Sequence, residues 1–107
     1  MDKTLLLEAL RKIDMTRPHA LGICALVSIG TKRGYLIDEV CDFFYPYYQR
    51  WPEYSGDRFY PVPSFDMTAR KAFETCNDMF DVATAYGRAR CRLLAFLISE
   101  LEKEIGE

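Results

Sequence analysis

The chain has 107 residues, half of them hydrophobic, and a formal net charge of -2. This length suits a single domain, and the apolar content is sufficient for a core that needs neither disulfides nor a metal. The composition excludes wholesale disorder, and the near-neutral charge excludes a global field that would attract nucleic acid.

The longest apolar run, residues 21–27, is too short to span a bilayer, and the few apolar residues before Glu8 do not form a signal peptide. We therefore expect a cytoplasmic protein with no membrane partner. No C-x-x-C pair is present, and His19 is the only histidine, so we predict neither a metal site nor a cofactor. In a reducing compartment, small buried thiols are expected at Cys24, Cys41, Cys76 and Cys91.

Helical periodicity begins near the N-terminus, where Leu6, Leu10 and Ile13 form one apolar stripe. A second helix is predicted from Pro18, which suits a first turn, to Gly30, which we interpret as the stop. Because residues 19–29 are apolar on nearly all sides, we expect this helix to be the most buried element.

A turn over residues 31–34 precedes a third helical pattern. Its apolar residues are spaced at i, i+3, i+4 and i+7, and they are Ile37, Val40, Cys41 and Phe44. Pro46 lacks an N–H and disfavours helical geometry at Tyr45, so this helix is predicted to end there. The outer face carries Asp38, Glu39 and Asp42, which either form an ordinary polar face or imitate nucleic-acid phosphates toward a basic host enzyme.

Two more apolar stripes lie in the C-terminal half. One covers residues 69–83, with Ser64 or Asp66 as its cap, and the other covers residues 86–105. Whether they are two helices or one kinked rod stays open. The complete pattern predicts an all-α orthogonal bundle of four or five helices, with residues 1–107 forming one domain.

The connection over residues 45–65 is unusual, because it contains four prolines and many aromatic residues but no helical or strand period. A loop this long is usually functional or disordered, and its aromatic content argues against disorder. Prolines reduce the entropy cost of fixing its rings, and the Ser-Gly-Asp sequence from Ser55 to Asp57 is typical of a turn.

Rigid Trp and Tyr side chains beside Arg are typical of binding hot spots. Two interpretations remain open: the loop is a structural lid, or it is a lid that also forms a binding surface. In the second case the apolar anchors are Trp51, Tyr54 and Tyr60, and polar specificity comes from Arg50 and Arg58. The predicted partner-binding residues are Arg50, Trp51, Tyr54, Ser55, Asp57, Arg58, Tyr60, Arg88 and Arg90.

Three arginines lie near the start of the last helical pattern. Arg88 and Arg92 point away from its apolar stripe, whereas Arg90 lies along it. Burial of an unpaired guanidinium is costly, so we predict a carboxylate partner for Arg90. Asp57 is the first candidate, and Asp78 and Asp81 are next. Either this pair clamps the loop to the last helix, or the arginine joins Arg50 and Arg58 in a pocket for phosphate or an acidic side chain.

Three motifs resemble a group of small phage and prophage proteins. They are Gly22-Ile23-Cys24, the W-P-x-Y-S-G-D-x-x-Y-P-V-P loop over residues 51–63, and the Y-G-x-x-R-x-x-L-L-x-F-L-I pattern over residues 86–98. The chain departs from that group at residues 43–46 and 76–78. The resemblance implies phage origin, hence the host cytoplasm, and an accessory role of the kind that often opposes host defences; it implies no activity.

Catalysis is not favoured, because the chain has no phosphate-cradling glycine loop, no G-x-S-x-G motif and no Ser or Cys with an evident His partner. We therefore predict no enzyme and no catalytic residue. The leading hypothesis is direct inhibition of a host defence protein. One alternative is a protein that sequesters a phosphate-containing small molecule or nucleotide signal, and another is nucleic-acid binding through Arg88 and Arg92. A homodimer is compatible with each.

Overall fold

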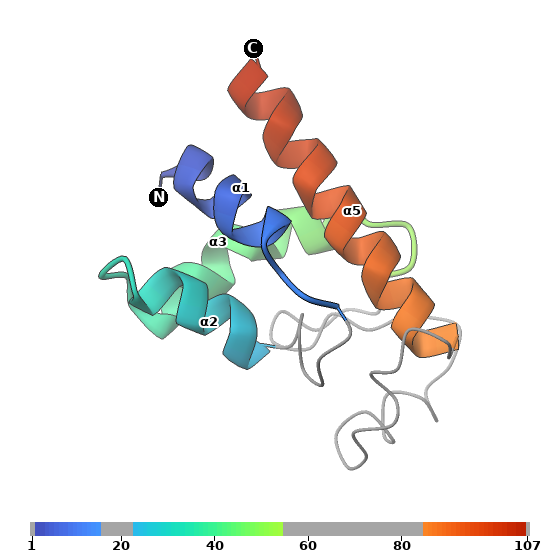
Figure 1. Ribbon diagram of the computed structural model, residues 1–107, viewed down its shortest axis with the longest axis horizontal. Coiled ribbons are helices and arrows are strands. Elements are labelled where there is room, and N and C mark those ends of the chain that lie inside the picture. Colours follow the sequence, from blue (N-terminus) through green and yellow to red (C-terminus); the bar gives the residue numbers. More distant parts are fainter. Residues whose placement is uncertain (1, 16–22, 55–84, 107) are drawn as a thin grey trace.

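The computed structural model describes residues 2–15, 23–54 and 85–106. Its regular structure in these residues consists of four helices, α1 (Lys3–Arg11), α2 (Ile23–Thr31), α3 (Ile37–Arg50) and α5 (Ala85–Gly106) (Figure 1). The all-α prediction is confirmed. Helix α1 packs on α5, and α2 packs on α3. The predicted helix over residues 69–83 and the predicted start of the second helix at Pro18 lie outside the described residues.

Helix α1 begins at a well-formed cap. The Asp2 carboxylate accepts hydrogen bonds from the backbone N–H groups of Thr4 and Leu5, at 3.0 and 3.2 Å. The stripe predicted from the sequence faces the interior, with Leu6, Leu7 and Leu10 buried. None of the described helices has the length and apolar character needed to cross a membrane.

The link between α2 and α3 is a Schellman motif centred on Gly34, which has φ +87°. The Tyr35 N–H donates to the Gly30 carbonyl at 3.1 Å, and the Gly34 N–H donates to the Thr31 carbonyl at 3.0 Å. The turn predicted at residues 31–34 is thus confirmed. The helix stop, however, is Gly34 and not Gly30, because only Gly34 adopts the left-handed conformation.

Gly30 has a different role, which is to let α2 and α3 approach one another. A Cβ atom built at this position would lie 2.1 Å from Cγ2 of Val40. No larger residue fits unless the two helices separate. The expectation that this helix is the most buried element stays a prediction, because most of residues 19–29 lie outside those whose burial is described; within the described part, Leu26 is buried and Val27 and Ile29 are half-buried.

Helix α3 does not end at Tyr45 as predicted, because it continues through Pro46 to Arg50. A proline inside a helix costs about 3 kcal/mol. Continuing the helix buries Tyr47, Tyr48 and, just beyond its end, Trp51. Each of these large side chains contributes about 2 kcal/mol on burial, so together they outweigh the proline. Pro46 itself lies on the exposed side.

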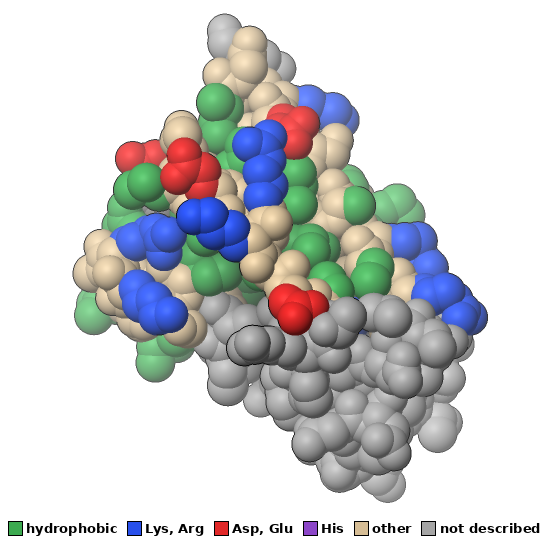
Figure 2. Space-filling view, viewed as in Figure 1, with side chains coloured by type: hydrophobic (Ala, Val, Ile, Leu, Met, Phe, Trp, Pro, Cys, Tyr) green, Lys and Arg blue, Asp and Glu red, His purple; other side chains and the backbone are tan. Residues whose placement is uncertain are grey.

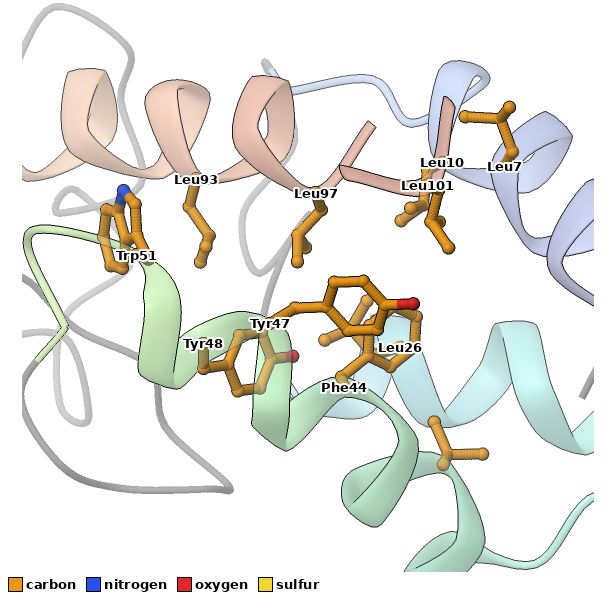
Figure 3. Close-up of a cluster of buried hydrophobic side chains, with 11 residues drawn as sticks. Leu7, Leu10, Leu26, Phe44, Tyr47, Tyr48, Trp51, Leu93, Leu97 and Leu101 are labelled. Atoms are coloured by element: carbon orange, nitrogen blue, oxygen red, sulfur yellow. The ribbon is translucent and has the colours of Figure 1, made fainter. Parts of the chain in front are cut away.

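The hydrophobic core contains side chains from all four described helices. Figure 3 shows the aromatic rings of α3 filling the space below α5, where Leu93, Leu97 and Leu101 project toward them. Phe44 and Tyr48 stack with ring centroids 6.2 Å apart. The aromatic residues of α3 therefore supply the volume that joins this helix to α5.

At the edge of the core, Glu104 connects three helices. Its Oε2 atom accepts a hydrogen bond from the Tyr47 hydroxyl at 2.6 Å and lies 2.8 Å from Nζ of Lys3. Both interactions lower the pKa of Glu104, and the one with Lys3 has the larger effect. Burial and the bond to Glu104 raise the pKa of Tyr47. The adjacent Tyr48 is fully buried, and its hydroxyl has no hydrogen-bond partner among the described residues.

We expect Gly30→Ala to destabilise the protein by about 1–3 kcal/mol, because the new methyl group overlaps Val40. Urea denaturation followed by circular dichroism measures this loss. Gly106→Ala is a matched control, since a Cβ there meets nothing within 4 Å. When Gly30→Ala is combined with Val40→Ala, the total loss should be smaller than the sum of the single losses. Additive losses would contradict the close approach.

Removal of the side-chain hydroxyl should change the free energy of unfolding in opposite directions at Tyr47 and Tyr48. Tyr47→Phe removes the bond to Glu104 and should lower the free energy of unfolding by about 1 kcal/mol. Tyr48→Phe removes a buried hydroxyl that bonds no described residue, and should raise it by about 1 kcal/mol. The same urea titrations compare the two variants. A destabilised Tyr48→Phe protein would show that the hydroxyl has a partner.

Candidate functional site

The aromatic loop predicted from the sequence starts inside the core. The indole of Trp51 is only 3% exposed, and Figure 3 shows it between α3 and α5, beside Leu93. The backbone N–H of Trp51 donates to the Tyr48 carbonyl, and the backbone N–H of Tyr54 donates to the Trp51 carbonyl, both at 3.1 Å. The first residues of the loop are therefore fixed to the end of α3.

This placement corrects the role predicted for Trp51. A ring with 3% of its surface exposed offers no area to a partner, so Trp51 is not an accessible anchor in this conformation. The reason is the continued helix: Phe44, Tyr48 and Trp51 follow one another at i, i+4 and i+7, on the face of α3 that meets α5. Trp51 fits the structural-lid interpretation.

Tyr54 is half-buried and packs against the same core. Its ring centroid lies 6.3 Å from that of Tyr45, with the ring planes tilted by 56°. The residue as a whole keeps part of its surface exposed, although its hydroxyl oxygen is buried. Of the two predicted aromatic anchors that the structure describes, Tyr54 is thus the one with accessible surface.

Arg50, the last residue of α3, makes several contacts within the molecule. Its guanidinium carbon lies 4.8 Å from the centroid of the Tyr47 ring, and Nη1 donates to the Pro46 carbonyl at 3.3 Å. Nη2 lies 3.8 Å from the carboxylate of Glu100. The side chain is 46% exposed, so each contact is weak and Arg50 can also meet a partner.

A bidentate ion pair fixes the loop to the last helix. The Arg92 guanidinium donates to both carboxylate oxygens of Glu53, through Nε at 2.8 Å and through Nη2 at 2.6 Å. The hydrogen bonds from Arg92 lower the pKa of Glu53, and those to Glu53 raise the pKa of Arg92. The fork geometry matches that of strong Arg–carboxylate pairs, although Arg92 is half exposed.

A clamp between loop and last helix was predicted, but on Arg90 and not on Arg92. The helical pattern of the sequence placed Arg92 on the outer face, and Glu53 was not among the predicted site residues. The outer placement is correct, since 52% of the Arg92 side chain is exposed. No sequence signal joins two residues that are 39 positions apart. Burial of Trp51 brings Glu53 to α5, and this burial depends on the tertiary structure.

Arg90 is buried, as its position along the apolar stripe predicted, with 3% of its surface exposed. Its candidate partners Asp57, Asp78 and Asp81 lie outside the described residues, so the predicted pairing stays a prediction. Arg88 is exposed on the same helix. The remaining predicted site residues, Ser55, Asp57, Arg58 and Tyr60, also lie outside the described residues.

Two ion pairs are described at this site, Arg92 with Glu53 and the looser Arg50 with Glu100. Among residues 2–15, 23–54 and 85–106, no three His, Cys, Asp or Glu side chains come close enough to hold a metal ion. Cys41 is a buried thiol, as predicted, and Cys91 is half-buried. His19, Cys24 and Cys76 belong to the part of the chain whose side chains are not described. The described groups are suited to ionic and aromatic recognition.

Comparisons with protein-family models, with curated proteins and with solved structures found no match to this chain. The resemblance to phage and prophage proteins, carried by the loop motif and its two flanking motifs, therefore stays a prediction.

The Glu53–Arg92 pair should make the free energy of unfolding depend on pH in the acidic range. Because the pKa of Glu53 is below its ordinary value of 4.5 in the folded protein, the pair stabilises fully above that value and is lost as the pH falls through the folded-state pKa. Glu53→Gln should thus lower the free energy of unfolding by about 0.5–1 kcal/mol near pH 7, given the exposure of Arg92. The deficit should be smaller at a pH of about 3 than near pH 7, because the carboxyl of the unfolded chain is then mostly protonated.

Urea titrations of the Glu53→Gln and unmodified proteins at both pH values test this pattern. Glu102→Gln is the control, because within the described parts of the chain Glu102 accepts a single hydrogen bond, from Arg11 at 3.0 Å, with both side chains half-exposed. Its effect should be smaller at neutral pH. A deficit of Glu53→Gln that is the same at both pH values would mean that the carboxylate charge does not stabilise the fold.

Proposed function

We propose that this chain is a non-catalytic accessory protein of a phage or prophage, which binds and inhibits a host protein that belongs to an antiviral defence system. The support from sequence is the aromatic, arginine-containing loop and the motifs that resemble phage proteins. The observation that carries the proposal in the structure is the attachment of the loop's first residues to two helices, through Trp51 in the core and Glu53 on Arg92.

A fixed loop base favours binding for an energetic reason. Ordering an interface side chain on association costs about 0.5–1.5 kcal/mol, and a segment that is already held in place avoids part of this cost. The backbone N–H groups of Trp51 and Tyr54 are hydrogen-bonded, both side chains pack in or against the core, and the Glu53 carboxylate is held by Arg92. Such an anchor supports presentation of the following residues in a defined direction.

The proposed recognition surface combines aromatic and cationic side chains. Tyr54 and Arg50 contribute at the base, where each keeps part of its side chain exposed. Arg58 and Tyr60 contribute from the loop sequence, and Arg88 contributes from the exposed side of α5. Tyr and Arg are enriched in binding hot spots because they combine large contact area with directed hydrogen bonds. Trp51 contributes as a buried anchor of the loop base.

The experiment is capture of a partner from host-cell lysate by the tagged protein, followed by an affinity measurement with the purified partner. An Arg58→Ala, Tyr60→Ala double variant should lose at least about 30-fold in affinity, since the loss of even one hot-spot side chain costs about 2 kcal/mol or more. Thermal unfolding of the variant, followed by circular dichroism, establishes that it still folds.

Lys103→Ala is the matched control, because Lys103 is an exposed cation near the far end of α5. It should bind the partner as the unmodified protein does. Equal affinity of the folded double variant and the control would refute the loop as the recognition surface. Trp51→Ala is unsuitable here, since it would remove a core side chain as well as any contact.

A further inference from the structure

A second surface lies at the other end of the molecule, where α2 turns into α3. Leu36 and Ile37 are 68% and 55% exposed, more than any other large hydrophobic side chain among the described residues. The sequence stripe placed Ile37 in the core, yet the first turn of α3 leaves it uncovered. Figure 2 shows hydrophobic and basic side chains next to one another at this end of the molecule.

Leu36 also breaks a local rule of helix formation. It occupies the N-cap position of α3, and its side chain forms no capping hydrogen bond. At the start of α1, by contrast, Asp2 caps two backbone N–H groups. Ser, Thr, Asp and Asn stabilise an N-cap, whereas Leu does not. Leu36 therefore neither stabilises the start of the helix nor suits a position exposed to water. Such a combination indicates a constraint other than folding.

Charges of opposite sign border this apolar pair along the chain. Lys32 precedes it, and Glu39 follows it, both exposed and neither in an ion pair with another described residue. Arg33 directs its guanidinium to the Ile29 carbonyl, at 2.7 Å. A partner of one charge would be repelled by half of this surface. A second copy of the chain, related by a two-fold axis, would bring each Lys32 toward the other copy's Glu39.

We propose that Leu36 and Ile37 form the centre of a homodimer interface, with Lys32 and Glu39 of the two copies pairing across the two-fold axis. The net charge of -2 gives little repulsion between copies. The patch is small compared with the area of about 1,000 Å² that stable interfaces bury, so the dimer is weak, with a dissociation constant on the order of 10–100 µM.

The first test uses Leu36→Ser, which improves the N-cap and removes the apolar side chain. Sedimentation velocity from about 10 µM to about 1 mM should show the unmodified protein dimerising, and Leu36→Ser weakening the dimer at least about tenfold. The same variant should unfold at a higher urea concentration than the unmodified protein, which excludes misfolding as the cause. Leu5→Ser, at a 43% exposed position on α1, is the control and should dimerise normally.

The second test uses charge reversal. Lys32→Glu and Glu39→Lys should each weaken self-association, because like charges then meet across the axis. An equimolar mixture of the two variants should regain dimers, since one copy then offers two acidic groups and the other two basic groups. A protein that stays monomeric over the whole range, a dimer unaffected by Leu36→Ser, or a mixture no better than its components would each overturn the proposal.

Discussion

The packing of α3 against α5 through large aromatic side chains is the constraint on which the other features of the described structure depend. Phe44, Tyr48 and Trp51 occupy one face of α3, and this face meets the leucines of α5. The helix has to continue past Pro46 for the last two of these residues to reach α5. Burial of the rings stabilises by more than the proline destabilises, so the local preference yields to the tertiary contact.

Polar interactions then form at the border of this core and connect segments that are distant in sequence. Glu104 joins α1, α3 and α5 through Lys3 and Tyr47, and Arg92 holds Glu53 beside α5. Both ion pairs are partly exposed, and each contributes about 1 kcal/mol or less. Their effect is mainly geometric, because they fix the direction in which the chain leaves α3 and enters the loop.

The two proposed binding surfaces lie at different ends of α3 (Figure 1). The loop base follows its C-terminus, beside α5, and the dimer surface surrounds its N-terminus, beside the turn from α2. A partner on the loop would therefore leave the turn uncovered. A dimer would present two loops at once, which would increase the effective affinity for a host protein that is itself oligomeric. The helix that organises the core also sets the separation of the two surfaces.

The sequence by itself determined the features that depend on local preference and on hydrophobic spacing. These are the buried stripe of α1, the turn at Gly34 and the buried position of Arg90. Only the tertiary structure decided the length of α3, because the helical preference lost at Pro46 is recovered from contacts with α5. It likewise decided the Glu53–Arg92 pair, whose members meet only after Trp51 is buried. Local rules describe neighbours in sequence, and these features depend on neighbours in space.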